Sequence, residues 1–350
     1  MTQTAPPSAV LPDVETLSAS ARFKHLLGSG WILILLVAML ATFTLIRPGQ
    51  FATPFNLTTL AIDAAILLVL AVGQAFVIMT AGIDLSVGSV LVFSSVVSTL
   101  TMLALSGEST ATYGQTDAGW LVIAVGAVVA VAAGALWGVI NGLLVSRTRI
   151  PALIVTLGTM GMALGAAQLL TNGQDVRGVP EKLVTVIGSG KFAGIPVLVL
   201  IAAAVAVAAG FALRKTRFGT WTLATGSNAE AARRSGVKVQ SQLLKVYAIA
   251  GALAGLAGMM AVARFSTTTI AGHTQDNLAT ISAVVLGGTS LFGGVGTIPG
   301  TVIGVFIPVV LLNGFIILGI PPFWQTVAMG AVLIMAVWID QAKRHKNTRL

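Results

Sequence analysis

Ser227 and Glu230 stand three residues apart in residues 214–245, a polar stretch of an otherwise apolar chain. This spacing fits a capping box, in which the Ser227 hydroxyl accepts from the Glu230 N–H and the Glu230 carboxylate accepts from the Ser227 N–H. The sequence predicts a helix of about two turns after Ser227. Gly236 is expected to end this helix in the left-handed conformation.

The predicted helix presents Ala231 and Ala232 beside Arg233 and Arg234. Small residues next to cations suit docking into a groove of another protein. The alternative is a solvated loop that is positive only because loops on the inner side of a membrane are positive. Spacing alone leaves both interpretations open.

A second candidate feature is the glycine-bounded junction of residues 82–88, which separates two apolar runs with almost no loop. Irregular backbone at membrane depth is tolerated only where protein or a watery cavity satisfies it. Asp84 and Ser86 are expected to cap the helix that follows, and contact with a transported solute is the alternative. Junctions interrupted by glycine also indicate the pathway in transporters.

The second half of the chain has a comparable interruption at residues 287–296, again between two apolar runs. Two such breaks suggest a duplicated architecture in which the breaks approach each other. Uncharged polar side chains inside the apolar runs fit a passage for neutral polyhydroxyl solutes, or else hydrogen bonds that hold helices together. These side chains are Gln74, Gln168, Asn313 and Gln325.

The sequence shows no motif for ATP hydrolysis, no ion-coupling relay and no catalytic residues. The stretch nearest to a phosphate-binding P-loop is Gly188-Ser189-Gly190-Lys191. It does not match the motif, because Thr185 stands where the first Gly should be and Phe192 follows the Lys. Only Asp63 and Asp84 bring charge near membrane depth, so no proton or ion relay is visible. With no cysteine and three scattered histidines, we expect no metal site and no cofactor.

Composition identifies an integral membrane protein. The chain is 56% hydrophobic and only 9% charged, which leaves too few charges for a water-facing surface. About ten apolar runs are long enough to cross a bilayer core of roughly 30 Å. They lie at residues 31–46, 57–80, 87–105, 119–145, 152–171, 195–213, 246–265, 278–292, 298–318 and 323–339.

Charge distribution predicts the orientation. Most of the 20 Lys and Arg residues fall in segments that share a side with the N-terminus, which places both termini and residues 214–245 in the cytoplasm. This bias explains the formal net charge of +9 without a nucleic-acid partner. We expect a disordered tail over residues 1–30, a transmembrane domain over 31–340 and a basic tail over 341–350.

Four stretches carry a family resemblance that extends from about residue 30 to 340. They are Gly226-x-Asn228-x-x-Ala231-Ala232-Arg233-x-Ser235-Gly236-Val237; Gly73-Gln74-Ala75-Phe76-Val77 to Gly82-Ile83-Asp84-Leu85-Ser86-Val87-Gly88-Ser89; Asn141-Gly142-Leu143-Leu144-Val145 to Thr156-Leu157-Gly158-Thr159; and Val284-Val285-Leu286-Gly287-Gly288-Thr289 to Gly293-Gly294. In order and spacing the chain resembles permease subunits of ribose/xylose-type ABC sugar importers, within the branched-chain amino acid/ribose permease superfamily.

The resemblance implies an all-α polytopic protein of the bacterial inner membrane, with about ten transmembrane helices in two pseudo-related halves whose helices are interrupted by glycine. It implies a permease dimer, a cytoplasmic ATPase, a periplasmic solute-binding protein and contact with membrane lipid. The implied ATPase-coupling residues are Gly226, Asn228, Glu230, Ala231, Ala232, Arg233, Ser235 and Gly236. The implied pathway residues are Gln74, Gly82, Asp84, Ser86, Gly88, Asn277, Gly287, Gly288, Thr289 and Gln325.

One departure affects the substrate. Family members commonly show a Glu-Leu-Asp-like stretch where this chain has Asp276-Asn277-Leu278-Ala279. The segment 273–277 is expected to face outside, where a binding protein docks or a solute enters. Simple sugars, polyols and other small polar solutes therefore stay open. A stand-alone secondary carrier and a membrane enzyme are the alternatives from other classes.

Overall fold

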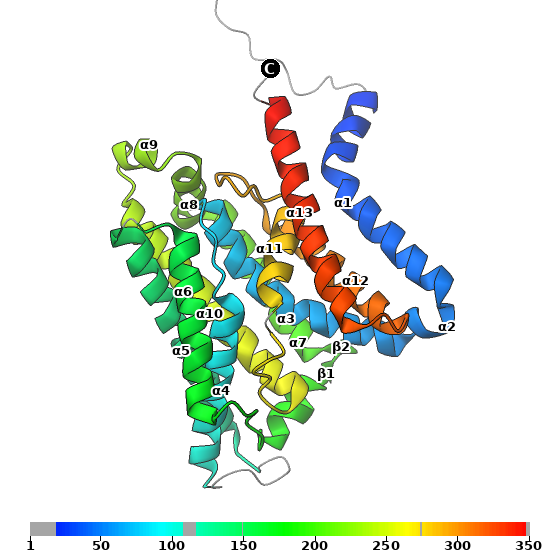
Figure 1. Cartoon of the computed structure of the whole chain (residues 1–350), viewed down its shortest axis with the longest axis vertical. Coiled ribbons are helices and arrows are strands. Elements are labelled where there is room, and N and C mark those ends of the chain that lie inside the picture. The colour runs from blue at the N-terminus through cyan, green and yellow to red at the C-terminus, as the bar shows by residue number, and fades with distance from the viewer. Residues whose placement is uncertain (1–18, 108–116, 149, 274, 348–350) are drawn as a thin grey trace, which may run out of the picture.

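The computed structural model describes residues 19–107, 117–148, 150–273 and 275–347, and its described part is built almost entirely of helices (Figure 1). The first half contains α1 (Ala19–Ile46), α2 (Pro48–Phe51), α3 (Pro54–Met79), α4 (Val87–Ser106), α5 (Trp120–Arg147) and α6 (Ala152–Thr171). A π-helical turn η2 (Leu183–Gly188) and a hairpin of β1 (Lys191–Phe192) and β2 (Ile195–Pro196) follow. The second half contains α7 (Val197–Lys215), α8 (Arg217–Ser227), α9 (Ala229–Arg234), α10 (Val239–Phe265), α11 (Asp276–Leu286), α12 (Ile298–Ile317) and α13 (Pro322–Asn347).

Seven of the described helices are long and apolar enough to cross a membrane, and three further apolar segments are shorter. The predicted span at 278–292 is wrong in extent, because α11 ends at Leu286. Its 11 residues rise only about 16 Å, roughly half of a bilayer core. α11 is therefore a half-helix.

Helices extend into both of the predicted terminal tails. α1 begins at Ala19, so residues 19–30 are helical and do not belong to a disordered tail. α13 continues to Asn347, so most of the predicted basic tail, 341–350, is also helix. Residues 1–18 and 348–350 lie outside the described part.

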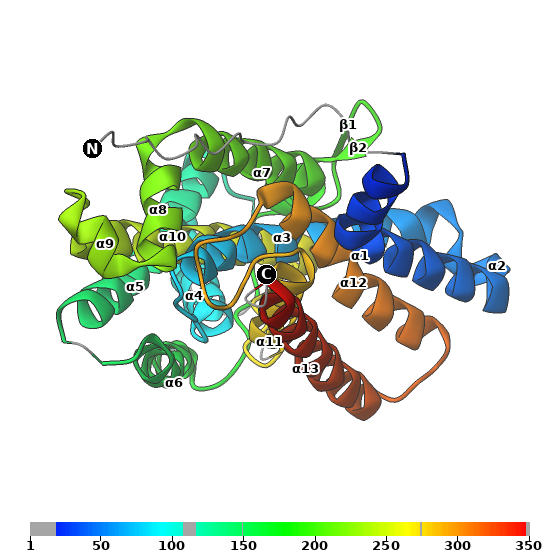
Figure 2. The ribbon, with the colours of Figure 1, turned by 90° about the horizontal axis from the view of Figure 1, so that it is seen from above.

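α3 is the central helix, and every residue from 69 to 79 is buried. Seen from above, α3 lies between a side built from α5 and α6 and a side built from α1 and α12 (Figure 2). The apolar sequence of α3 allows this placement, because a helix that is hydrophobic all round is a buried helix.

α5 and α10 pack closely through glycine. A Cβ on Gly255 would overlap the Ala130 carbonyl oxygen, and one on Gly251 would overlap the Gly134 carbonyl oxygen. Gly258 approaches α4 in the same way, since a Cβ on it would lie 2.6 Å from the Leu91 carbonyl oxygen. The small-residue run 251–258 is thus used in packing inside the molecule.

Two helices begin part-way through the molecule. α3 ends at Met79 and α4 starts at Val87, after a non-helical segment, 80–86, that runs back between other helices (Figure 1). Likewise α10 ends at Phe265, and residues 266–273 lead back toward the start of α11. The predicted break at 287–296 does separate α11 from α12, but the interruption before α11 was not predicted.

Candidate functional site: the junction of two interrupted helices

The first turns of α4 and α11 meet inside the molecule. The Gly88 backbone N–H, in the first turn of α4, donates to Asn277 Oδ1 at 2.8 Å. A Cβ on Gly88 would lie 2.6 Å from the His273 carbonyl oxygen and 2.9 Å from Asn277 Oδ1. Gly88 therefore permits the close approach of the two helix starts, and Asn277 satisfies one of the N–H groups that a helix leaves free.

Asp84 stabilises the segment that leads into α4. Its side chain is 2% exposed, and Oδ1 accepts from the Ser86 N–H at 2.8 Å and from Ser86 Oγ at 2.6 Å. Neither the Asp84 nor the Ser86 side chain caps α4 itself. The predicted capping role is wrong. Asp84 bonds to Ser86, which precedes the first residue of α4, and the Gly88 N–H in the first turn of α4 is satisfied by Asn277.

A chain of side-chain hydrogen bonds continues from Ser86 into α5 and α6. Asn141 Nδ2 donates to Ser86 Oγ at 2.8 Å, and Thr159 Oγ1 donates to Asn141 Oδ1 at 2.6 Å. Thr156 Oγ1 lies 3.1 Å from the Ile83 carbonyl oxygen. These residues were not named as site residues, although they lie in motifs that carried the family resemblance.

Gln74 holds the same segment from α3. Its amide is fully buried, and in the orientation that satisfies both groups it donates to the Asp84 carbonyl oxygen at 3.1 Å and accepts from the Asp84 N–H at 3.3 Å. Gly82 packs against Tyr247, whose buried hydroxyl lacks a partner among the described residues. Side chains of the protein thus satisfy backbone hydrogen-bonding groups of the irregular segment 80–86, as non-helical backbone at membrane depth requires.

The start of α11 is more buried than expected for an outer loop. His273 and Asn277 are only 8% and 7% exposed, and His273 Nδ1 lies 2.7 Å from Asp276 Oδ2. Residues 273 and 277 therefore do not form an exposed outward-facing surface. Gln275 and Asp276 between them stay partly exposed.

The remaining predicted pathway residues lie apart from Asp84. Gly287 packs against α12, where a Cβ would lie 2.5 Å from the Gly300 carbonyl oxygen, and Gly288 adopts a left-handed turn with φ of 88°. Thr289 is buried, and its hydroxyl lacks a hydrogen-bond partner in the described structure. Gln325 is half-buried in the first turn of α13.

Two other polar side chains take different places. Asn313 on α12 and Asn56 on α3 exchange hydrogen bonds of 2.9 and 3.0 Å between their amides, so Asn313 holds helices together. Gln168 is exposed on α6. Asp63, at membrane depth on α3, lies 3.8 Å from Arg264.

At one end of the molecule, α8 and α9 form the predicted coupling loop (Figure 1). The N-cap of α9 is Asn228, whose Oδ1 accepts from the Ala231 N–H at 2.9 Å. The predicted capping box is wrong by one residue, because Ser227 is the last residue of α8. Gly236 has φ of 88°, which confirms the predicted left-handed end.

Glu230 bonds to arginines instead of closing a capping box. Its carboxylate lies 2.7 Å from Arg233 and 3.2 Å from Arg234, and all three side chains are exposed. Ala231 is exposed, whereas Ala232 is 5% exposed and packs in a small cluster with Val237 and Val239. Ala232 therefore anchors α9 to the body and cannot be presented to a partner as predicted.

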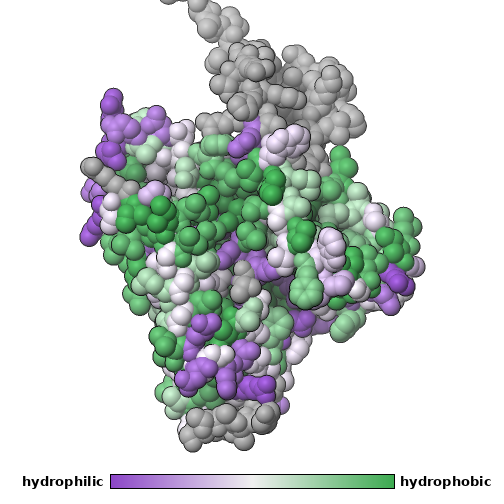
Figure 3. Space-filling model, viewed as in Figure 1, coloured by the Kyte–Doolittle hydropathy of each residue, from purple (hydrophilic) through white to green (hydrophobic). Residues whose placement is uncertain are grey.

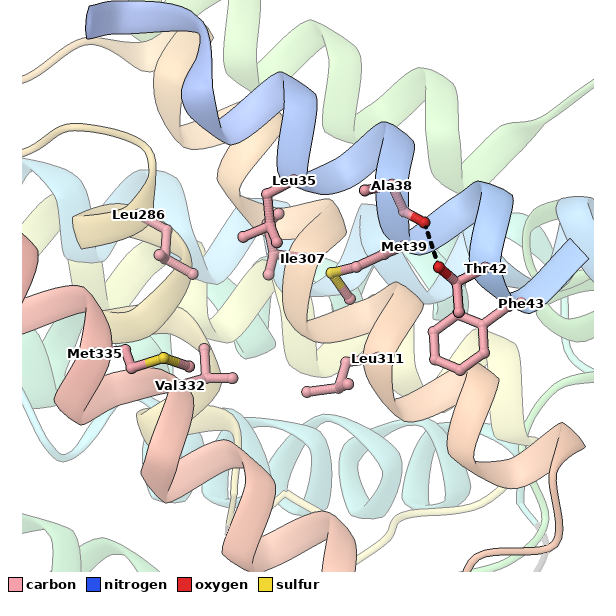
Figure 4. A pocket seen from close by; sticks show the side chains of 10 residues that line it. All are labelled: Leu35, Ala38, Met39, Thr42, Phe43, Leu286, Ile307, Leu311, Val332 and Met335. Carbon is pink, nitrogen blue, oxygen red and sulfur yellow. Dashed lines mark hydrogen bonds between the residues drawn. The ribbon is translucent and has the colours of Figure 1, made fainter. Parts of the chain in front are cut away.

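An apolar cavity of about 470 Å³ lies between α1, α11, α12 and α13 (Figure 4). Among the described residues that line it, only Thr42 has a polar side chain, and its hydroxyl donates to the Ala38 carbonyl oxygen at 2.8 Å. The other lining residues are Leu35, Ala38, Met39, Phe43, Leu286, Ile307, Leu311, Val332 and Met335. The cavity offers few groups that a sugar requires, so the polar junction remains the candidate site.

The family described as "Branched-chain amino acid transport system / permease component" matches residues 56–337. The ribose import permease protein of Escherichia coli strain K12 is 38% identical over 319 residues, covering 89% of this chain and 93% of that protein. The L-arabinose ABC transporter permease protein of Azospirillum brasilense is 34% identical over 351 residues, covering 99% and 98%. The fructose import permease protein of Rhizobium meliloti is 33% identical over 340 residues, covering 94% and 89%. No solved structure matches the chain.

Proposed function

The chain belongs to the family of branched-chain amino acid transport system permease components, and from this membership we propose that it translocates a simple sugar or polyol. It is a permease subunit of an ABC importer, a multi-pass protein of the inner membrane and a transport component rather than an enzyme. Membership implies an ATPase subunit and a periplasmic solute-binding protein as partners. The observation that carries the sugar proposal is the similarity to ribose, arabinose and fructose permeases over nearly the whole chain.

The chemistry of the junction supports a neutral hydroxylated solute. The polar side chains around the start of α4 are mostly amides and hydroxyls: Ser86, Asn141 and Thr159 bond to one another, and Gln74 bonds to the Asp84 backbone. Amides and hydroxyls both donate and accept, which matches the hydroxyl groups of a sugar. The one carboxylate among them, Asp84, is already bonded to Ser86.

We propose that the solute passes beside the junction of α4 and α11. Interrupted helices at membrane depth mark binding sites and pathways in transporters. Gln275 and Asp276 stay partly exposed where α11 starts, and Gln275 Nε2 reaches Thr326 Oγ1 on α13 at 2.5 Å. Gln325, next to Thr326, is also partly exposed. These side chains are the proposed contacts of the moving solute.

We also propose a permease homodimer. Figure 3 shows hydrophilic residues part-way along a face that is otherwise apolar. Polar groups at this depth are costly against lipid. A second copy on this face would cover the apolar rim and leave a polar passage between the subunits, while lipid covers the remaining apolar surface.

We propose that the ATPase subunit binds the exposed side of α9. Glu230, Ala231 and Arg233 are exposed at the tip, and Asn228 and Gly236 fix the two ends of α9. We place this end, residues 214–245, in the cytoplasm, because it holds seven of the 20 Lys and Arg residues, and most of the others fall in segments assigned to the same side. The start of α1 and the end of α13 lie toward the same end (Figure 1), which supports cytoplasmic termini.

Reconstitution tests the proposal. The permease is placed in proteoliposomes with its ATPase and binding protein, and uptake of labelled pentoses, hexoses and polyols is measured with and without ATP. We expect uptake of at least one of these solutes only when ATP and both partners are present. Uptake by the permease alone would indicate a secondary carrier. ATP-dependent uptake of only other solute classes would overturn the sugar assignment.

A further inference from the structure

Three backbone segments that are distant in sequence meet at the coupling end of the molecule. They are residues 79–81 at the end of α3, residues 226–227 at the end of α8, and residues 293–294 between α11 and α12. We call this contact the glycine junction. The inference below rests on the proposed function, and it concerns how ATP-driven motion reaches the pathway.

The contact is made by backbone atoms. The Gly294 N–H donates to the Met79 carbonyl oxygen at 2.9 Å. A Cβ on Gly226 would overlap the same Met79 oxygen, and one on Gly293 would lie 2.7 Å from the Ala81 nitrogen and 2.9 Å from the Gly226 oxygen. The three segments therefore touch without side chains between them.

The position of the contact gives it a mechanical consequence. Gly226 lies in the last turn of α8, two residues before the Asn228 cap of α9. Ala81 lies in the segment 80–86, which contains Asp84 and leads to the pathway end of α4, and Gly294 follows the half-helix α11. The glycine junction thus joins the end of α8, next to α9, to the segment before α4 and to the segment after α11.

Close backbone contact transmits displacement well. Packed protein interiors have low compressibility and transmit strain, whereas contacts between long side chains can relax by rotamer changes. A shift of α9 driven by the ATPase is thus passed to residues 79–81 and 293–294 together. Glycine is needed because even a methyl group would separate the segments.

We propose that the glycine junction is the transmission contact of the importer, and that it moves α9 and both interrupted elements as one unit. Gly226, Gly293 and Gly294 are positioning residues in this scheme, since they act on the pathway through Met79 and Ala81. Widening the junction should uncouple ATP hydrolysis from transport, while fixing it covalently should leave transport intact.

The first experiment compares Gly294→Ala with Gly319→Ala in the reconstituted importer. Both glycines have positive φ, 77° and 70°, so both variants carry similar backbone strain. A Cβ at Gly294 lies 2.9 Å from Ser227 Cα, whereas nothing lies within 4 Å of one at Gly319. We expect Gly294→Ala to lower solute uptake per ATP hydrolysed about tenfold or more, and Gly319→Ala to keep the wild-type ratio.

A disulfide tests the same contact in a folded protein. The chain has no cysteine, and a Cβ at Gly294 lies 2.9 Å from Ser227 Cβ, close enough for a bridge after a small shift. The Ser227→Cys/Gly294→Cys pair is oxidised, and uptake is measured before and after reduction, with each single variant as control. We expect the bridge to form and to retain or restore coupling relative to reduced protein.

Several results would overturn the inference. These are an unchanged uptake-to-hydrolysis ratio in Gly294→Ala, or a bridge that blocks uptake until a reductant is added, because the contact would then have to open. Failure of the bridge to form in the assembled importer would also count against it. The ratio is read with any solute that the wild-type importer transports, so a wrong sugar assignment does not imitate these results.

Discussion

The side-chain oxygen of Asn277 accepts a 2.8 Å hydrogen bond from the backbone N–H of Gly88, across 189 residues of sequence. This bond fastens the start of α11 to the start of α4. Because both helices begin inside the molecule, their free N–H groups cannot all turn to bulk water. The second half of the chain thus satisfies a backbone donor of the first half at the candidate pathway.

We predict that Asn277→Ala destabilises the permease, because it leaves the Gly88 N–H buried without an acceptor, at about 1–3 kcal/mol. Asn277→Asp keeps an acceptor oxygen, and its charge is favoured beside helix N-termini. The melting temperature in detergent and the uptake rate should fall for the Ala variant and be largely retained by the Asp variant. Equal losses in both variants would contradict a capping role.

The register of the α9 cap gives a second prediction. Asn228→Ala removes the acceptor of the Ala231 N–H and should destabilise α9 by about 1 kcal/mol, which weakens ATPase binding. Asn228→Asp keeps the cap and should bind as wild type does. Ser227→Ala should have little effect on the helix, whereas a capping box would make it the damaging change. Affinity for the ATPase subunit is the measurement.

Glu230 and Arg233 should matter for the partner and not for the fold. Exposed ion pairs contribute only about 0–1 kcal/mol, so replacing both with Gln should leave insertion and melting temperature near wild type. We expect uptake and association with the ATPase to be lost. Lys182→Gln is the control, since it breaks an exposed 3.2 Å pair with Asp117 outside the coupling loop. Normal uptake in the double variant would refute the coupling assignment.

Substitutions of Asp84 distinguish a structural role of this residue from direct contact with the solute. Asp84→Ala removes the acceptor of two hydrogen bonds from Ser86 and should destabilise the permease by roughly 1.5–3 kcal/mol per lost bond at most. Asp84→Asn keeps an acceptor, so it should retain most of the stability and an unchanged apparent KM for the solute. A large rise of KM in a stable Asn variant would instead indicate that Asp84 touches the solute.

The sequence allowed much of the helical architecture to be predicted, because long apolar runs follow directly from the thickness of the bilayer. The helical tip ending at Gly236 was also predictable, since a left-handed end favours glycine. Which residue caps the start of α9 was not predictable. Both Ser227 and Asn228 are good caps, and the length of α8, which takes Ser227 as its last residue, decides between them.

The helix junction could not be predicted from local sequence. Residues 266–275 look like an ordinary outer loop, and only the fold places His273 and Asn277 against α4. The extent of α11 was also misjudged, because the predicted span 278–292 ran past Leu286, where the helix ends and Gly287 and Gly288 follow. Long-range hydrogen bonds of this kind depend on tertiary contacts that no periodicity encodes.

The meeting of α4 and α11 also bears on the insulation of the membrane. Each helix start carries a partial positive charge of roughly half an elementary unit, and here two of them face the same region. Positive helix ends beside a pore raise an electrostatic barrier to protons and other cations. An importer built this way can pass an uncharged solute while the ion gradients across the membrane stay intact.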